Sequence, residues 1–188
     1  LKRPDEAYEQ GNLAMELDPL NPLIQALYSV ILLDRGDHKE IISLFEDVYH
    51  PIINFSLIQC YNKLGDYQKS FELLMAHVRL IYDESTVNAI QKTYEENGYA
   101  AAFEMIGRAY KKRYEESYML PTDIAFIYAL AEIQPEEVLR LLELGFEIND
   151  PGMPYIACRA FPLDIVRNDP RYIEILKKMN LPPGESQR

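Results

Sequence analysis

Three pairs of adjacent carboxylates are the residues that come closest to a catalytic arrangement: Glu95-Glu96, Glu115-Glu116 and Glu136-Glu137. Two carboxylates that act together as acid and base must flank the same bond of a substrate. Neighbouring residues of a helix point about 100° apart, so the members of each pair do not converge on one atom. The pairs therefore indicate solvated helix faces.

The histidines and cysteines show no spacing typical of a metal site. His38, His50 and His77 do not form a His-x-x-x-His pattern, and Cys60 and Cys158 lie far apart in the sequence. The chain also lacks the glycine-rich patterns that bind phosphate and the nucleophile elbow of hydrolases. We therefore expect no metal, no cofactor and no enzymatic activity.

One basic cluster, Arg108-Ala-Tyr-Lys-Lys-Arg113, stands out against the acidic background. Its cations and its tyrosine could contact a phosphate group. Glu115 and Glu116 follow directly, however, and cations near the C-terminal end of a helix interact favourably with the helix dipole. The second interpretation is sufficient to explain the cluster.

The composition excludes several classes of protein. The 188 residues are 48% apolar and carry a formal net charge of −11, which is typical of a folded chain that repels the phosphates of nucleic acid. No run of about 18 uncharged apolar residues exists, so we expect no membrane span. Two cysteines without a framework pattern favour a reducing compartment, and we expect a cytoplasmic location.

A short break recurs between the apolar segments that would form helices and position any site. It appears in DRGDHKEIISLF (34–45), KLGDYQKSFELL (63–74) and EENGYAAAFEMI (95–106). Gly36, Gly65 and Asn97 are residue types that accept the left-handed conformation at a helix end. Apolar residues of helical period flank each break, and the spacing is about 30 residues. The pattern predicts an all-α fold, an α-solenoid of stacked helix–turn–helix repeats.

These units resemble the tetratricopeptide repeat, whose period is about 34 residues. The first match has a stripe of small residues at Ala7, Gly11 and Ala14, closed by Asp18-Pro19. Large wedge residues of the first helices are Tyr28, Tyr61, Tyr94 and Tyr128. The chain departs from the pattern at Ile41 and His77, where alanine is usual, and at Glu132, which stands where the fifth unit's glycine belongs.

The repeats are expected over 1–148, with a partial first unit and about four more. Because the match begins within the second helix of a unit, we expect the first helix of that unit to precede Leu1. Alternatively, Pro4 to Leu17 is an N-terminal capping helix. We expect an irregular linker over 149–161, a C-terminal capping segment over 162–182 and a tail over 183–188.

The capping segment, FPLDIVRNDPRYIEILKKMNLP, has the signals of a helix. Asp169 is a suitable N-cap, and Pro170 suits the first helical position. The predicted apolar face consists of Tyr172, Ile173, Leu176 and Met179. Arg167 and Arg171 could form an ion-pair cluster around Asp169.

This segment is similar to the terminal segment of a group of bacterial regulatory tetratricopeptide proteins. The matching residues are Pro162, Asp164, Arg167, Asp169, Pro170, Arg171, Tyr172, Leu176 and Leu181. In that group the repeats follow a DNA-binding, kinase or nucleotide-cyclase domain. The resemblance implies that this chain is the regulatory portion of a larger bacterial signalling or transcription protein.

The expected function is therefore protein–protein interaction, with a peptide or domain bound on a concave face lined by the first helices. A solenoid that senses a small molecule is the alternative. By the geometry of the repeats that this chain resembles, the candidate groove residues are Phe55, Gln59, Asn62, Lys63, Gln91, Tyr94, Phe126 and Leu130. Amides can pair with a peptide backbone while aromatic rings cover its side chains.

The charge of the chain narrows the class of partner. A net charge of −11 favours a neutral or basic protein or peptide. Only Asn62 and Lys63 approach the cationic clamp with which related repeats hold acidic C-terminal peptides, so such peptides are not expected to bind. No pattern in the sequence specifies an oligomeric state.

Overall fold

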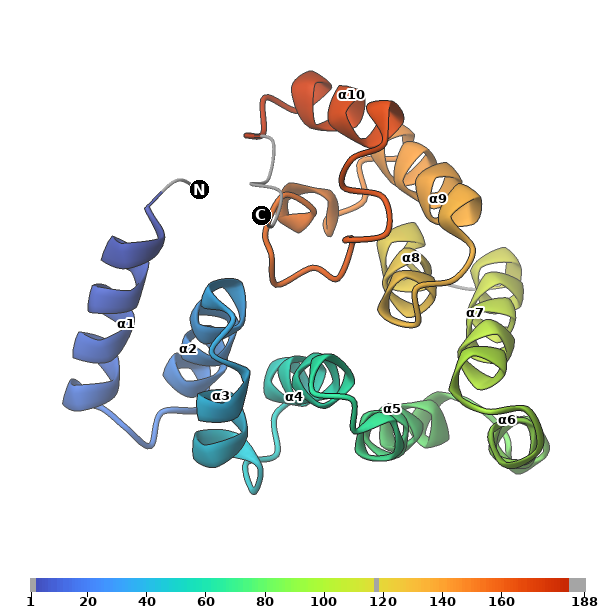
Figure 1. Ribbon diagram of the computed structural model, residues 1–188, viewed down its shortest axis with the longest axis horizontal. Helices are drawn as coiled ribbons and strands as arrows, with labels where there is room; N and C mark the ends of the chain where they lie inside the picture. Colours follow the sequence, from blue (N-terminus) through green and yellow to red (C-terminus); the bar gives the residue numbers. More distant parts are fainter. Residues whose placement is uncertain (1–2, 117–118, 183–188) are drawn as a thin grey trace. The chain divides into compact units, whose positions relative to one another are not determined.

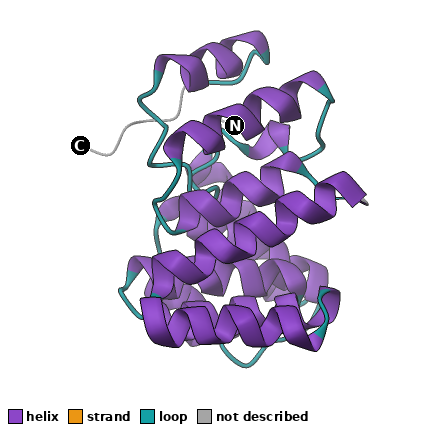
Figure 2. Ribbon diagram, turned by 90° about the vertical axis from the view of Figure 1, so that its right-hand side faces the viewer, coloured by secondary structure: helices purple, strands orange, loops and turns teal. Residues whose placement is uncertain are grey.

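The computed structural model describes residues 3–116 and 119–182. The chain divides into two compact units, unit 1 (Leu1–Tyr82) and unit 2 (Asp83–Arg188). Every regular element of the described residues is a helix, as Figure 2 shows. The predicted all-α class is confirmed, and the solenoid spanning the whole chain stays a prediction. The predicted tail 183–188 lies outside the described residues.

Unit 1 contains five helices that pack as consecutive antiparallel neighbours (Figure 1). They are α1 (Pro4–Leu17), α2 (Pro22–Arg35), α3 (His38–Phe45), α4 (Pro51–Lys63) and α5 (Tyr67–Ile81). Helix α2 contacts α1, α3 and α4, and α4 also contacts α3 and α5. Contact between α2 and α4, which are two elements apart, places α3 beside both of them and gives unit 1 a continuous core.

Unit 2 continues with helices that pack mainly on their neighbours in sequence. They are α6 (Glu84–Asn97), α7 (Tyr99–Glu116), α8 (Pro121–Leu130), α9 (Pro135–Glu147), the 3-10 turn η1 (Met153–Tyr155) and α10 (Pro170–Lys178). The core of the unit is centred on α8, of which every residue except Asp123 is buried.

Glycines end two helices as the sequence predicts. Gly36 has a φ of 86° and Gly65 a φ of 81°, which confirms the left-handed conformation at both positions. The prediction for Asn97 is wrong. Asn97 is the last residue of α6, and Gly98 takes the positive φ of 83°, because a residue without a Cβ adopts that conformation at no steric cost.

The same type of hydrogen bond closes the ends of α2, α4 and α8, among others. In each, the amide after the left-handed residue donates to a carbonyl five residues earlier, the bond of a Schellman motif. The pairs are Asp37 N to Leu32 O (3.0 Å), Asp66 N to Tyr61 O (2.8 Å) and Ile133 N to Tyr128 O (3.0 Å). Glu132 adopts a φ of 55° in the third case, so it occupies the position that glycine holds after α2 and α4.

Two predicted wedge tyrosines lie against glycines of the preceding helix. A Cβ on Gly11 would lie 2.9 Å from Cδ2 of Tyr28, and a Cβ on Gly107 would lie 2.5 Å from Cζ of Tyr128. One contact joins α1 to α2 and the other joins α7 to α8. The glycines let the helix backbones approach closely enough for each ring to be buried.

The segment between α9 and α10 is irregular apart from η1, yet it is packed into unit 2. Met153 and Ile156 are buried. The buried carboxylate of Asp150 accepts hydrogen bonds from the backbone N of Thr122 (2.9 Å), from Thr122 Oγ1 (2.9 Å) and from Gly152 N (2.7 Å). Asp150 therefore supplies acceptors to the first turn of α8, because Leu120, the N-cap residue, has no side-chain acceptor.

Helix α10 begins as the sequence predicts. The side chain of Asp169 accepts from Arg171 N, and Pro170 is the first helical residue. The buried side chains are Tyr172, Ile175 and Leu176. Ile173 and Met179 of the predicted apolar face are only half-buried, whereas Ile175, which was not predicted, is buried.

Candidate functional site

Four of the eight candidate groove residues lie along α4. Helix α4 begins at Pro51, with the ring of His50 accepting a hydrogen bond from Ile52 N (3.2 Å). Asn54 Nδ2 donates to the carbonyl of Leu73 (3.3 Å), which fixes α4 against α5. The position of the candidate residues relative to α5 is therefore set by a hydrogen bond as well as by packing.

The α4 candidates differ in how much of each side chain is accessible. Lys63 is exposed, Phe55 and Asn62 are half-buried, and Gln59 is buried with 6% of its surface exposed. The ring of Phe55 meets His77 of α5 edge-on, with centroids 5.7 Å apart. Burial lowers the pKa of His77, which favours a neutral imidazole behind the aromatic ring.

The other four candidates belong to unit 2. Gln91 and Tyr94 are half-buried on α6, and Gln91 Nε2 donates to Glu95 (3.1 Å). Phe126 and Leu130 are buried in α8, and Phe126 meets the ring of Phe161 edge-on at 6.0 Å. Unit 1 therefore groups one set of candidates on α4, and unit 2 places a second set on α6 and α8.

A groove along α7 was not among the sequence predictions. It has a volume of about 520 Å³ and is lined by Thr93, Ala101, Glu104, Met105, Arg108, Ala109 and Lys112. The apolar lining residues recur every four residues along α7, beside its buried positions. Thr93 Oγ1 of α6 lies 3.2 Å from Met105 Sδ. In the sequence, only the four-residue spacing of Ala101, Met105 and Ala109 could have indicated this groove. The same spacing is equally typical of a helix face that packs in the core.

Three cations of the basic cluster on α7 form ion pairs with carboxylates. Arg108 pairs with Glu104 at 2.6 Å and Lys112 with Glu116 at 3.8 Å, both one turn away on the same helix. Lys111 reaches Glu137 of α9 at 2.7 Å. These three cations are therefore paired with carboxylates of unit 2, and Arg108 and Lys112 remain exposed.

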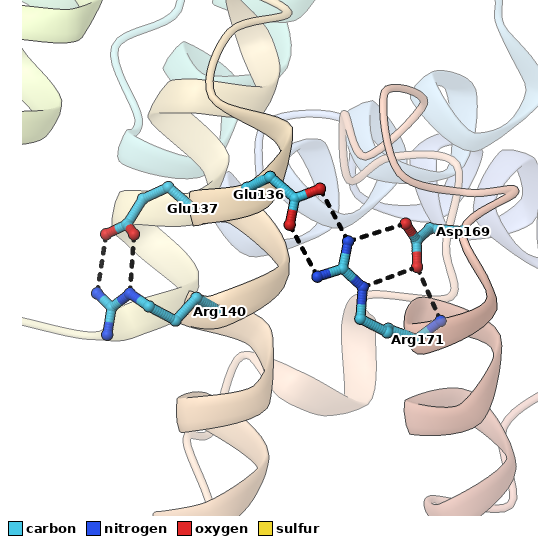
Figure 3. A network of polar contacts seen from close by, with 5 residues as sticks. All are labelled: Glu136, Glu137, Arg140, Asp169 and Arg171. Carbon is cyan, nitrogen blue, oxygen red and sulfur yellow. Dashed lines mark hydrogen bonds and ion pairs between the residues drawn. The ribbon is translucent and has the colours of Figure 1, made fainter.

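The adjacent carboxylates Glu136 and Glu137 bind different cations (Figure 3). Glu137 accepts two hydrogen bonds of 2.8 Å from Arg140, whereas Glu136 accepts bonds of 2.8 and 3.0 Å from Arg171 of α10. Arg171 also pairs with Asp169 at 3.1 Å. The two carboxylates point apart, as helix geometry requires, and Glu136 links α9 to the capping helix.

Electrostatics distinguishes the two members of this pair. Hydrogen bonds from Arg140 and then from Lys111 lower the pKa of Glu137 to about 2, although burial opposes the shift. Glu136 is more exposed, and hydrogen bonding to Arg171 lowers its pKa. Both groups are therefore ionised at neutral pH and serve as structural anions.

The predicted cluster around Asp169 includes Arg171 but not Arg167. The Arg167 side chain is only 9% exposed and pairs with Asp164 at 2.9 Å. Its Nη2 donates to the carbonyls of Cys158 (2.9 Å) and Phe161 (2.7 Å). The loop before α10 folds around the guanidinium of Arg167, so its carbonyls become the partners of this side chain. The sequence spacing does not indicate this fold of the loop.

The side chains that commonly bind metal ions do not cluster in the part of the chain that the structure describes. Within residues 3–116 and 119–182, no group of three His, Cys, Asp or Glu side chains is arranged to hold a metal ion. No helix of the same ranges has the length and apolar character needed to cross a bilayer. Burial raises the pKa of the Cys60 thiol to about 12, so this thiol stays protonated at neutral pH.

No protein-family model, curated protein or solved structure matches this chain. Its function must therefore be inferred from its own residues.

Proposed function

We propose that the chain is a helical-repeat interaction module that binds a neutral or basic protein or peptide along α4. The accessible row formed by Phe55, Asn62 and Lys63 carries this proposal. The ring of Phe55 is backed by His77, so it offers a rigid aromatic surface at little entropic cost. Asn62 lies seven residues further along the same helix face and supplies amide groups that can pair with a peptide backbone.

The charge of the molecule supports the class of partner. The net charge of −11 attracts basic segments and repels nucleic acid. By the resemblance of its repeats and capping segment, the module would regulate a larger bacterial signalling or transcription protein in the cytoplasm. It would act by binding, without catalysis.

The groove along α7 supports an alternative, a small-molecule sensor. Its volume of about 520 Å³ falls in the range of ligand pockets, roughly 300–1,000 Å³. Ala101, Met105 and Ala109 would contact the apolar part of such a ligand, and Arg108 and Lys112 would contact its polar groups.

The experiment identifies a partner by affinity capture on the chain and then measures its affinity for variants. Phe55→Ala combined with Asn62→Ala should weaken binding by about tenfold or more. Tyr67→Ala is the matched control, because Tyr67 is a half-exposed aromatic residue of the same unit on α5. The helical circular dichroism of both variants should equal that of the unchanged chain.

Two results would count against the proposal. Unchanged affinity of the double variant with an intact fold would remove α4 from the binding surface. A small molecule retained by the purified chain in native mass spectrometry, and lost in Met105→Glu but kept in the α4 double variant, would favour the sensor.

A further inference from the structure

Five exposed leucines gather around the connection between α1 and α2. Their exposed fractions are 47% for Leu13, 77% for Leu17, 84% for Leu20, 59% for Leu23 and 52% for Leu27. The helices are antiparallel neighbours in unit 1 (Figure 1), so the first and last of these leucines lie about one turn from the connection. Single exposed leucines need no explanation, but five within fifteen residues indicate that an apolar side of this hairpin is left uncovered.

Leu13 and Leu17 lie on the side of α1 that faces away from α2. Gly11 and Asn12 are on the opposite side, because Gly11 lies against Tyr28 and Asn12 accepts a hydrogen bond from Tyr28 Oη. Leu13 and Leu17 are one helical turn apart and so form a ridge. Helix α1 contacts α2 through its opposite face, so Leu13 and Leu17 take no part in that contact.

The charges beside this ridge are negative. Glu9 and Glu16 lie four and three residues from Leu13 and so share its face of α1. Within the ranges that the structure describes, no cation lies at ion-pair distance from Glu9 or Glu16, whereas Asp5 lies 3.7 Å from Arg35. The exposed side of α1 therefore combines an apolar ridge with uncompensated carboxylates.

We propose that this edge of the α1–α2 hairpin is a docking surface for a basic amphipathic helix of a partner protein. This surface is additional to the α4 row and does not depend on it. Apolar residues of the incoming helix at i, i+3, i+4 and i+7 would cover the ridge formed by Leu13 and Leu17. Lysine or arginine beside its apolar stripe would approach Glu9 and Glu16.

Charge complementarity favours this occupant over a second copy of the chain. A two-fold symmetric contact would bring the same surface of each copy together. It would place the Glu9 and Glu16 carboxylates of both copies around one small contact, between molecules that each carry a charge of −11. A basic helix removes that repulsion and covers the same leucines.

The test uses the whole chain and synthetic helical peptides of about 18 residues, long enough for five turns. One peptide has leucine on one face and lysine elsewhere, the second replaces lysine by glutamate, and the third scrambles the first so that no stripe remains. Binding is measured by fluorescence anisotropy at about 0.15 M salt. The striped lysine peptide should bind about tenfold or more tightly than either of the others.

Matched variants locate the contact. Leu13→Gln with Leu17→Gln should weaken binding of the striped lysine peptide by about tenfold or more. The control, Leu44→Gln with Leu80→Gln, changes leucines of the same unit that are 46% and 71% exposed and should leave the affinity unchanged. Glu9→Lys with Glu16→Lys should reverse the preference between the lysine and glutamate peptides.

Three outcomes would overturn the proposal. The first is a loss of peptide affinity in the leucine control variant that equals the loss in Leu13→Gln with Leu17→Gln. The second is an affinity for the scrambled peptide that equals the affinity for the striped lysine peptide. Both results would show that the attraction is non-specific. The third is a concentration-dependent dimer in sedimentation analysis that Leu13→Gln with Leu17→Gln abolishes, which would assign the surface to a second copy. The substituted leucines are exposed, so a retained helical spectrum is expected and is checked for each variant.

Discussion

At the scale of single residues, the contact between Gly107 and Tyr128 sets the approach of α7 to α8. Tyr128 is 3% exposed, so its ring has no space into which it could move. A Cβ at Gly107 would lie 2.5 Å from Cζ of this ring. The ring and the glycine are thus interdependent, and a substitution at either position changes the other's environment.

Gly107→Ala should therefore destabilise the chain. In a helix without such a contact, the substitution would stabilise by about 1 kcal/mol through helix propensity. Here the overlap with Tyr128 should reverse the sign and cost about 1–3 kcal/mol, measured by urea unfolding. In a Tyr128→Leu background the same substitution should become neutral or stabilising, and a cost independent of Tyr128 would disprove the assigned contact.

Glu137 should give stability that depends on pH. Its pKa is about 2 in the folded chain, below the ordinary value of 4.5, and its side chain is 19% exposed. The ion pairs with Arg140 and Lys111 therefore stabilise fully above about pH 5. This contribution is lost as the pH falls from about 4.5 toward 2, because the unfolded chain binds the proton first.

Glu137→Gln should lower the free energy of unfolding by about 1–2 kcal/mol at pH 7. The difference from the unchanged chain should shrink below about pH 4.5, as followed by urea unfolding at several pH values. Glu136→Gln is the matched control and should have a smaller effect, because water screens its pair with Arg171. A difference that stays constant down to pH 3 would contradict the role given to Glu137.

At the scale of elements, the capping helix is held by hydrogen bonds as well as by its apolar face. Tyr172 is buried, and its hydroxyl donates to the carbonyl of Ile156 at 2.8 Å. Arg167 Nη1 donates to the same hydroxyl at 3.3 Å, and Nη2 donates to the carbonyl of Phe161. The loop before α10 and the helix itself therefore share one polar network, next to the apolar contact with α9.

Arg167→Lys should destabilise unit 2 even though it preserves the charge. An ammonium group cannot reproduce the fixed geometry in which one guanidinium serves Asp164 and several other acceptors. Loss of the buried carbonyl contacts should cost about 1–3 kcal/mol in thermal or urea unfolding. Arg140→Lys, at an arginine whose side chain is 53% exposed, should cost less, and equal costs would refute the importance of the buried geometry.

The backbone conformation at helix ends depends both on the local residue type and on tertiary packing. Gly36 and Gly65 were predicted because glycine tolerates a positive φ, and both adopt it. Glu132 adopts a φ of 55° without that advantage. Its conformation is maintained by the packing of α8 against α9 and by the bond from Ile133 N to Tyr128 O.

At the scale of the whole molecule, the dominant electrostatic feature is the excess of 30 acidic over 19 basic residues. Like charges on a folded chain repel one another more strongly than in the expanded unfolded state. Several ion pairs, among them Lys92 with Glu96, are exposed and weak. When salt is added, the stability gained by screening the repulsion should therefore exceed the stability lost by screening the attractive ion pairs.

The unfolding temperature should thus rise when sodium chloride increases from about 0.01 to 0.15 M, where the screening length falls from about 30 to 8 Å. Potassium chloride should give the same increase, because screening does not depend on the identity of the monovalent cation. A decrease in the unfolding temperature would mean that attractive ion pairs dominate the folded state.

The sequence by itself determined the helical class and several boundaries. Helical periodicity, Pro170 after Asp169, and glycine at positions 36 and 65 act through the local backbone, so they can be read without knowledge of the remote contacts. The same local reasoning showed that Glu136 and Glu137 diverge. The resemblance to the tetratricopeptide repeat, and not local reasoning, selected Phe55 and Asn62, which are half-buried on α4.

Tertiary structure alone decided which helix faces are covered. Gln59 and Leu130 are buried although they were chosen as groove positions, whereas Leu13 and Leu17 are exposed. The groove along α7 and the capping of α8 by Asp150 also join residues that are distant in sequence. Periodicity identifies an apolar or polar face, but burial depends on which other element lies against that face, and that is fixed by packing across the fold.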